Sequence, residues 1–383
     1  MREELGRSAF MKSVILSLFQ NPVGAEVTRL RHLGNQRLLT SSPTVLKAPL
    51  LFQAALAVAL AAAGASEATN APAPVLTTEP RRWSLSLRWE NDMFAGTDRF
   101  YTDGISLSLL HTGGGWLEPV ADWLPWGKGR HCVGYDVGQI MITSGNKLLP
   151  IPDPNDRPYA GILYGGLSLH IDRDNSYHGL KVIGGVVGPW SYAEQTQKLV
   201  HRWVGSPQPQ GWDYQLNNEP IFNLVYEYRH KFRLLGGPRG LALEALPTGT
   251  VMLGNLLTQG QVGGQVRFGY NLPDDFGLAL IGGMGQLPPP RLDPDPRVRA
   301  KTGLYLYGGL QGSLVLHNIT LDGNTWQDSP RVDKNHLVPS AEVGVALASR
   351  RFLAAFSYVF LGREFKGQPD PSEFGAFTVT YRF

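Results

Sequence analysis

The last ten residues of the chain constrain its fold more than any other segment. The segment Phe374–Phe383 reads FGAFTVTYRF, and apolar residues at every second position alternate with threonine and arginine. Because successive side chains of a strand point to opposite faces, the segment predicts a strand with one apolar and one polar face. A chain that stops on such a strand is typical of an outer-membrane β-barrel. The last strand of a soluble sandwich is the alternative for this segment taken alone.

Composition agrees with a barrel and excludes several other classes of protein. Of the 383 residues, 43% are hydrophobic, 17% are charged and 45 are glycine. A mean hydropathy of −0.14 excludes a helical membrane protein. A single cysteine, Cys132, excludes an internal disulfide framework, and a net charge of +3 gives no indication of a nucleic-acid partner.

One long apolar run lies near the N-terminus. It covers Ala48–Ala65, follows Lys47 and is followed by small residues, which is typical of the hydrophobic region of a secretion signal. We therefore interpret residues 1–68 as an N-terminal extension plus signal peptide, 69–80 as a linker and 81–383 as the exported barrel.

The remaining sequence predicts a transmembrane, antiparallel, up-and-down, all-β barrel of about 12 strands. Short alternating segments separated by turn residues occur at Trp83–Glu90, Gly104–His111, His131–Met141, Gly161–Ile171, His178–Val187, Pro220–Phe232, Gly240–Val251, Thr258–Tyr270, Thr302–Val315, Leu337–Ala348, Phe352–Leu361 and Phe374–Phe383. The apolar run Phe276–Met284 is assigned to an irregular connection, with a thirteenth strand as the alternative.

One segment follows a helical period instead. Ser191–Val204 carries apolar residues at helical spacing between Gly188-Pro189 and Gly205, and predicts a short helix in an extracellular loop, over or inside the barrel mouth. If both termini face the periplasm, the first three extracellular connections hold Asn91–Asp103, Thr143–Ala160 and Gly188–Glu219. Most of the chemically capable polar residues lie in these three loops, so they predict a site at the extracellular rim.

Four residues of these loops are candidates for chemistry. By strand parity Asp92 and Thr102 should face the lumen, where clustered oxygens suit a hard cation such as calcium; a hydrogen-bonded polar lumen without metal is the alternative. Lys147 is either an oxyanion donor or a solvated loop charge. His201 lies on the predicted helix, where it is either a general base or a packing residue.

Several motifs in fixed order resemble one known family. WENDMFAGTDRFYTDG (89–104), NDRPYAGILYGG (155–166), GPWSYAEQTQKLVHRWVG (188–205), GWDYQLNNEP (211–220), GYNLPDDFG (269–277) and the C-terminal segment are similar to the outer-membrane lipid A 3′-O-deacylases. The resemblance covers residues 81–383. It implies a twelve-stranded barrel in the cell outer membrane and calcium-dependent removal of the 3′-linked acyloxyacyl chain of lipid A.

The resemblance also implies roles for individual residues. By motif, His201 activates water, Asp92 helps to hold calcium, and Lys147 stabilises the oxyanion together with the metal. Asn91 and Thr102 orient the metal, the water or the ester, and Thr102 as a nucleophile activated by His201 is the weaker option. The implied partners are lipid A of the outer-leaflet lipopolysaccharide and, during insertion, the barrel-assembly machinery.

The sequence departs from the family pattern at one position. The family has a glutamate six residues beyond the histidine, whereas this chain has Pro207, so another group must replace the carboxylate, with Glu194 and Glu219 as candidates. Two other functions stay open at this point. They are a phospholipase on a similar barrel and a narrow porin or structural barrel without enzymatic activity.

Overall fold

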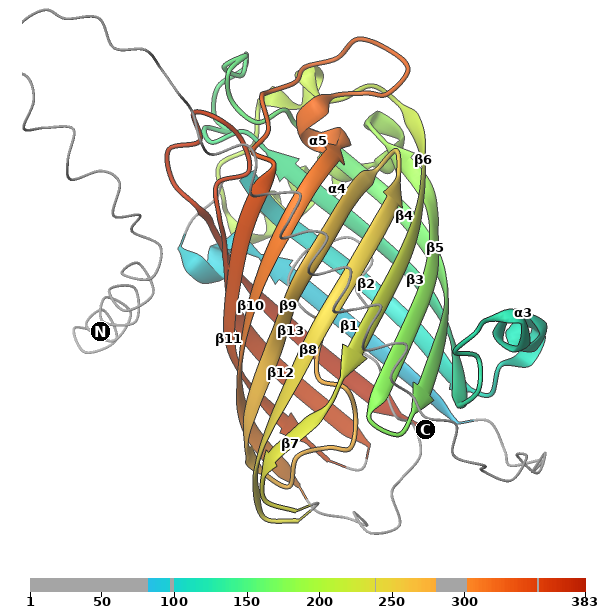
Figure 1. Cartoon of the computed structure of the whole chain (residues 1–383). Coiled ribbons are helices and arrows are strands. Elements are labelled where there is room, and N and C mark those ends of the chain that lie inside the picture. The colour runs from blue at the N-terminus through green and yellow to red at the C-terminus, as the bar shows by residue number, and fades with distance from the viewer. Residues whose placement is uncertain (1–81, 97–99, 238, 280–301, 350) are drawn as a thin grey trace, which may run out of the picture. The chain divides into compact units, whose positions relative to one another are not determined.

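A closed antiparallel sheet makes up most of the described chain, which comprises residues 82–96, 100–237, 239–279, 302–349 and 351–383 of this computed structural model (Figure 1). Its strands are β1 (Trp83–Asn91), β2 (Phe100–Thr112), β3 (Arg130–Thr143), β4 (Ala160–Arg173), β5 (Ser176–Val187), β6 (Glu219–His230), β7 (Phe232–Leu235), β8 (Leu241–Gly254), β9 (Leu257–Tyr270), β10 (Gly303–Asn318), β11 (Leu337–Ala348), β12 (Phe352–Leu361) and β13 (Ser372–Arg382).

Two pairings close the sheet into a barrel. Consecutive strands are neighbours except for β6 and β7, which both pair with β8, and β1 pairs with β13. The four residues of β7 extend the sheet beside β8 below the pairing of β6 with β8. The other strands, twelve within the described residues, form an up-and-down barrel, as the sequence predicts.

The predicted strands are confirmed with small shifts at their ends, and β11 and β12 have the predicted bounds. Residues 276–279 lie outside any strand, as the predicted irregular connection requires, while 280–284 lie outside the described residues. The predicted extension, signal peptide and linker also lie outside them. None of the helices in the described part of the chain has the length and apolarity needed to cross a membrane.

Helical turns occupy the connections. They are η3 (Asp92–Ala95), η4 (Gly115–Leu117), α3 (Glu118–Trp123), η5 (Pro189–Ser191), α4 (Ala193–Val204), η6 (Gly211–Tyr214) and α5 (Ile319–Asp322). The predicted helix at Ser191–Val204 therefore corresponds to α4, entered through η5.

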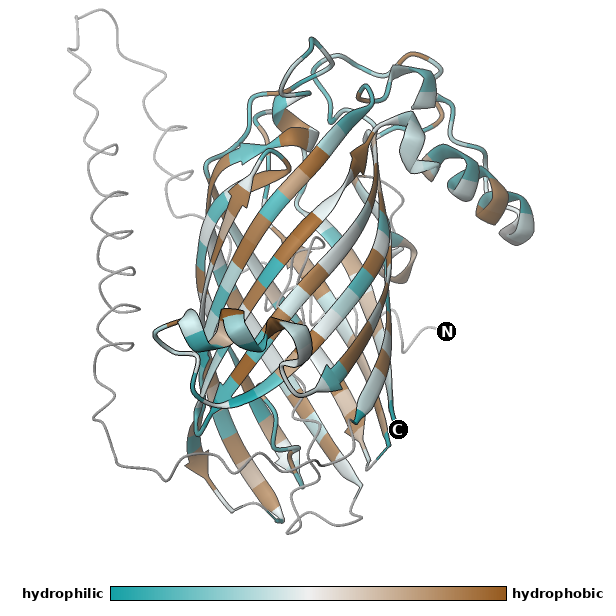
Figure 2. Ribbon diagram, turned by 90° about the vertical axis from the view of Figure 1, so that its right-hand side faces the viewer, coloured by the Kyte–Doolittle hydropathy of each residue, from teal (hydrophilic) through white to brown (hydrophobic). Residues whose placement is uncertain are grey.

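Alternation along the strands separates a lipid-facing wall from a filled lumen. In β1, Leu85 and Leu87 point outward and are exposed, whereas Ser86 is buried and its hydroxyl lies 2.8 Å from that of Thr380 on β13. Figure 2 shows hydrophobic and hydrophilic residues alternating along the strands. The strand faces are thus those expected of a barrel whose outside meets hydrocarbon.

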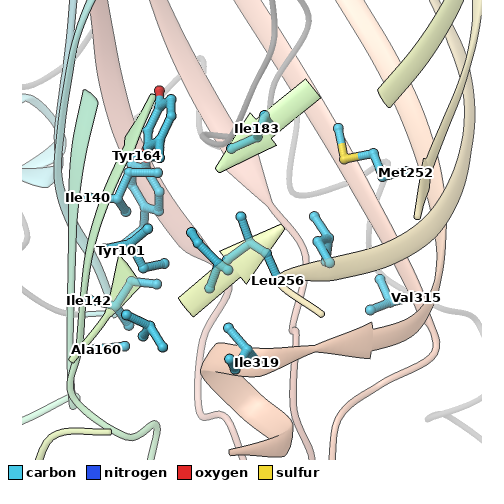
Figure 3. Close-up of a cluster of buried hydrophobic side chains, with 14 of the residues drawn as sticks. Tyr101, Ile140, Ile142, Ala160, Tyr164, Ile183, Met252, Leu256, Val315 and Ile319 are labelled. Carbon is cyan, nitrogen blue, oxygen red and sulfur yellow. The ribbon is translucent and has the colours of Figure 1, made fainter. Parts of the chain in front are cut away.

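The lumen holds an apolar layer and a charged layer. The apolar layer includes Tyr101, Ile140, Met252 and Val315, which Figure 3 shows on different sides of the interior. The charged layer consists of paired groups: Lys181–Asp136 (3.0 Å), Arg229–Glu227 (2.7 Å), and Arg267 with Glu244 (2.7 Å) and Asp275 (2.5 Å). Pairing is required because an isolated buried charge is strongly unfavourable.

The chain segment after β9 folds into the lumen. Phe276 is fully buried against Tyr177 and Leu246, and the Arg229 guanidinium donates to the carbonyl oxygens of Phe276 (3.0 Å) and Leu278 (2.6 Å). Together with the two layers of side chains, this segment fills much of the interior. Such filling favours a structural role for the lumen over the open channel of a porin.

The connection between β2 and β3 lies against the outside of the barrel. Leu117 and Ala121 pack on Val133 and Leu169, which face outward from β3 and β4. Figure 2 shows this connection lying across the wall. On its other side Trp123 is 83% exposed, so an aromatic ring points away from the barrel at the level of the strands. Aromatic residues at such positions are typical of membrane interfaces.

Candidate active site

The candidate residues lie at one rim of the barrel, opposite the rim at which β1 begins and β13 ends. This rim carries η3, the long β3–β4 connection and the β5–β6 connection that contains α4 (Figure 1). In outer-membrane barrels the long connections are extracellular and the termini are periplasmic, so we assign this rim to the cell exterior.

Helix α4 has an inverted amphipathic pattern. Ala193, Gln197 and His201, spaced four residues apart, are its buried side chains, whereas Leu199 and Trp203 are exposed. Residues at this spacing form one face of a helix. A helix that buries an amide and an imidazole, and leaves a tryptophan 77% exposed, is suited to stand between a polar site and lipid.

The buried face of α4 packs against the outer face of the barrel wall. Ala193 clusters with Met141, Tyr159 and Trp212. Met141 alternates with the lumenal residue Ile140, so it points outward. The prediction that the helix lies over or inside the barrel mouth is therefore wrong, because α4 contacts the outside of β3 and β4. The candidate site consequently lies where α4 packs against the outer wall.

A β-bulge brings Thr102 to this outer face. The β2–β3 register shifts between Tyr101 and Asp103, so Thr102 is the extra residue. Its hydroxyl lies 2.8 Å from that of Thr143, which shares the outward parity of Met141. The prediction from strict alternation that Thr102 faces the lumen is wrong. Bulges commonly redirect a side chain in this way beside active sites.

Asn91 lies on the same outer face, at the end of β1. Its amide nitrogen donates to Asp103 Oδ2 at 2.6 Å, and the indole nitrogen of Trp89 donates to the same oxygen at 3.1 Å. Asn91 Oδ1 accepts from the backbone N–H of Met93 (2.7 Å), which caps η3. Both ends of the Asn91 amide are therefore fixed, and Asp103 is held against the wall.

His201 is held by the chain that follows its own helix. Gly205 has a left-handed φ of 72° and ends α4, so that the chain turns back. The carbonyl oxygen of Pro207 then lies 2.7 Å from His201 Nδ1. Because a carbonyl can only accept, Nδ1 carries the proton, and Nε2 of the neutral ring keeps its lone pair.

The electrostatic surroundings of His201 favour the neutral ring. Burial lowers the pKa of His201 below its ordinary value of 6.5, and the positive charge of Lys147 acts in the same direction. The hydrogen bond to Pro207 and the charge of Asp103 oppose this shift without cancelling it. At neutral pH the ring is thus mainly an unprotonated base.

Lys147 connects His201 to Asp92. Its backbone carbonyl accepts from Gln210 N (2.9 Å) and from the Tyr159 hydroxyl (3.3 Å), which fixes the β3–β4 connection beside the segment after α4. Burial lowers the pKa of Lys147, and the charge of Asp92 partly offsets this effect. Asp92 is 2% exposed and begins η3, so strand alternation no longer determines its direction.

Neither predicted substitute for the family glutamate is engaged with His201 in the described contacts. Glu194 pairs with Lys198 at 2.6 Å, one turn along the exposed side of α4. Glu219 accepts from Asn255 (3.1 Å) and from the backbone N–H of Thr325 (2.8 Å). The group that contacts the imidazole is the backbone carbonyl of Pro207, at the position where the family has its carboxylate.

The structure thus brings the five predicted site residues to one region of the rim. The charge of Lys147 acts on His201, and the charge of Asp92 acts on Lys147. Asn91 and Thr102 lie on the adjoining outer face of the wall. Three participants were missed by sequence reasoning. Gln197 was detectable from its four-residue spacing to His201, and Asp103 from its place beside Thr102. The carbonyl of Pro207 has no side-chain signal.

We predict that Gly161→Ala detaches the first turn of α4. A Cβ at Gly161 would lie 2.2 Å from Ser191 Oγ and 2.4 Å from Ala193 Cβ, so the helix must move away from β4. Hydrogen exchange followed by mass spectrometry should show faster exchange across residues 193–204. Gly184→Ala on β5 is the matched control, because nothing lies within 4 Å of its added Cβ. Equal protection of α4 in both variants would contradict the packing.

One of three similar known structures has a TM-score above 0.5 and agrees with this architecture. LpxR from Salmonella typhimurium superposes with a TM-score of 0.63 at 19% identity, over 78% of this chain and 99% of that one. The β domain of the Bordetella autotransporter BrkA gives 0.37 at 12% identity, over 79% and 98%. The translocator domain of NalP from Neisseria meningitidis gives 0.30 at 10% identity, over 88% and 97%.

Sequence comparison identifies the family. No curated protein matches the chain. The family described as outer membrane protein LpxR matches residues 50–383, which include every strand of the barrel. The likeness to the Salmonella protein supports the same fold, and the barrel is that of a protein of the cell outer membrane. The chain therefore belongs to the LpxR family of outer membrane proteins.

Proposed function

We propose that this protein is a lipid A 3′-O-deacylase, a carboxylic ester hydrolase that removes the 3′-linked acyloxyacyl chain. The observation that supports the proposal best is the state of His201. Its ring is held through Nδ1, has a lowered pKa and lies beside Lys147, between the outer wall and a helix with an exposed apolar side. An oriented base at that place suits an ester that remains anchored in the outer leaflet.

The reaction we propose is hydrolysis by activated water. His201 Nε2 accepts a proton from water as the water oxygen forms a bond to the ester carbonyl carbon. The resulting tetrahedral intermediate collapses as its bond to the sugar oxygen breaks, and His201 returns the proton to that oxygen. The free acyloxyacyl acid and a 3′-hydroxyl are the products. The backbone carbonyl of Pro207 stabilises the imidazolium that forms, because it accepts a hydrogen bond from Nδ1–H throughout the reaction.

The neighbouring residues supply charge and orientation. The Lys147 ammonium stabilises the negative charge that develops on the ester carbonyl oxygen, and its partial burial strengthens that interaction. Thr102 and Asn91 line the wall side, where their fixed side chains position water or ester. The hydrogen bond between Thr102 and Thr143 and the absence of a described contact to His201 favour positioning over a nucleophilic role for Thr102.

The metal ion that we propose for this site is calcium. Within the described residues no group of three or more His, Cys, Asp or Glu side chains is placed to hold a metal. Asp92 offers a buried carboxylate, and its neighbour in sequence, Asn91, carries an amide oxygen. Oxygen-only sites with few charges suit calcium. Bound there by Asp92, calcium would supply further positive charge for the developing oxyanion.

The first prediction from the proposed reaction concerns the base. His201→Asn should lower deacylation about 100- to 10,000-fold, because proton transfer in the transition state is lost. Mass spectrometry of lipid A from expressing cells should show that the 3′ acyl chains are retained, while folding, read from heat-modifiable migration in gels, is unchanged. His336→Asn on the same rim is the control and should keep full activity.

The same experiment separates the alternatives. Phospholipids are extracted from the same cells, and loss of their acyl chains without change in lipid A would support a phospholipase instead. Full lipid A deacylation by His201→Asn would exclude the proposed base. Conductance of the purified barrel without any ester hydrolysis would support a pore.

The second prediction concerns pH. The neutral imidazole is the active form, so kcat/KM should be constant at neutral pH and fall by about tenfold per unit once the pH is below the pKa of His201. That pKa lies below 6.5 because of burial and Lys147, with Asp103 opposing. Lys147→Met should move the acid limb to higher pH, since one cause of the lowered pKa is removed. A limb unchanged by this variant would contradict the coupling.

The third prediction concerns the metal. A calcium chelator should abolish deacylation, and Asp92→Asn should raise the calcium concentration for half-maximal activity by at least about tenfold, because a charged ligand is lost. Calcium should also raise the unfolding temperature of the wild type and do so less for Asp92→Asn. Asp213→Asn, at an exposed position in η6, is the control. Calcium responses identical in all three proteins would remove Asp92 from the site.

A further inference from the structure

The buried face of α4 contains a second polar group whose purpose packing does not explain. Gln197 precedes His201 by four residues and is 3% exposed, so both side chains face the barrel wall one helical turn apart. Apolar residues would satisfy a purely packing role at this position, as Ala193 does one turn earlier.

One contact fixes the orientation of the Gln197 amide. The indole N–H of Trp212 donates to Gln197 Oε1 at 2.8 Å, and Trp212 is itself fully buried. An indole nitrogen is a donor only, so the amide oxygen must face Trp212 and the NH₂ group must point away from it. The direction of the amide therefore follows from hydrogen-bond chemistry and does not depend on distinguishing oxygen from nitrogen.

The NH₂ group of Gln197 is buried and has no hydrogen-bond partner among the described residues. This state is unfavourable, since buried donors in folded proteins almost always have an acceptor. Gln139 provides a contrast within the same site, because its NH₂ group donates to the carbonyl oxygen of Ser191 at 2.6 Å and so ties η5 to the wall. The NH₂ group of Gln139 thus has a hydrogen-bond acceptor, whereas in Gln197 only the amide oxygen has a partner.

We infer that Gln197 Nε2 is a catalytic hydrogen-bond donor to the carbonyl oxygen of the scissile ester. This inference rests on the proposed function. Trp212 would hold the donor in place before substrate arrives, so that little reorganisation is needed during the reaction. With Lys147 it would form a two-donor site for the oxyanion: one donor from the β3–β4 connection and one from α4. His201, on the same helix face, then serves the attacking water.

The decisive variant is Gln197→Glu. It keeps an oxygen that accepts from Trp212 but replaces the NH₂ donor with a second acceptor. Removing one oxyanion donor typically lowers kcat about 100- to 1,000-fold, so we expect a loss of kcat in this range, with KM changed less than about threefold. The measurement uses the full-length protein in detergent micelles with purified lipopolysaccharide. It is made at pH values above the acid limb of His201, so that the added charge does not alter the state of the base.

Gln195→Glu is the matched control. It introduces the same charge on the same helix at an exposed position, and its activity should equal that of the wild type. Trp212→Phe provides a second variant, in which the amide is free to rotate, and kcat should fall to a value between those of the wild type and Gln197→Glu. A structural role for Gln197 predicts the opposite order, because Gln197→Glu preserves the Trp212 contact and Trp212→Phe removes it.

Two results would overturn the inference. One is a folded Gln197→Glu protein with kcat within twofold of the wild type, and the other is a loss confined to KM. Neither would affect the proposed function, which fails separately if the wild-type protein releases no acyl chain from lipopolysaccharide. If Gln197→Glu does not fold, the kcat of Trp212→Phe decides, since unchanged activity there would show that no fixed amide is needed.

Discussion

Strands in hydrocarbon must pair all of their backbone N–H and C=O groups with one another, because no water is available to do so. In this chain the pairings of β1 with β13 and of β6 with β8 complete that requirement. Closure divides every strand into an inward and an outward face, and the two faces then take different residues. The inward face carries paired charges such as Arg267 with Glu244, and the outward face carries leucine and aromatic residues.

The candidate site depends on local departures from this regular division. Strict alternation would point Thr102 into the lumen, but a one-residue bulge moves it to the outer face of the wall. Gly161, which lacks a side chain, lets α4 approach the same stretch of wall. The helix then covers the polar residues with its own buried face. Polar chemistry is thereby placed on the outside of a barrel without being exposed to lipid.

The fold was predictable from the sequence because alternation has a physical cause that acts on every spanning strand. The closing segment at Phe374–Phe383 and the strands β11 and β12 carry this pattern with few exceptions. The order of the motifs was enough to indicate the family. The three polar loops were also correctly assigned to one rim, since strand parity fixes the end of the barrel at which each connection lies.

The details of the site were less accessible to sequence reasoning. A bulge changes the face to which a side chain points, but it does not require a particular residue type. The alternation of the sequence therefore predicted the wrong face for Thr102. Amphipathicity showed that α4 is a helix but not which side of the wall it covers. The substitute for the family glutamate was sought among carboxylates, whereas the contact to His201 comes from the Pro207 backbone, which is available at every position of a chain.

The position of α4 outside the wall also decides how a ligand reaches the buried imidazole. A lumenal site would have to draw a molecule out of the leaflet and down a channel, against the full hydrophobic cost of exposing its tails. Beside the wall, Trp203 and the apolar residues Leu199 and Val200 are exposed, as side chains that border a leaflet would be. For the ester hydrolysis proposed above, encounter would then be a matter of lateral diffusion in two dimensions, and turnover would depend on the mole fraction of the lipid in the leaflet rather than on its bulk concentration.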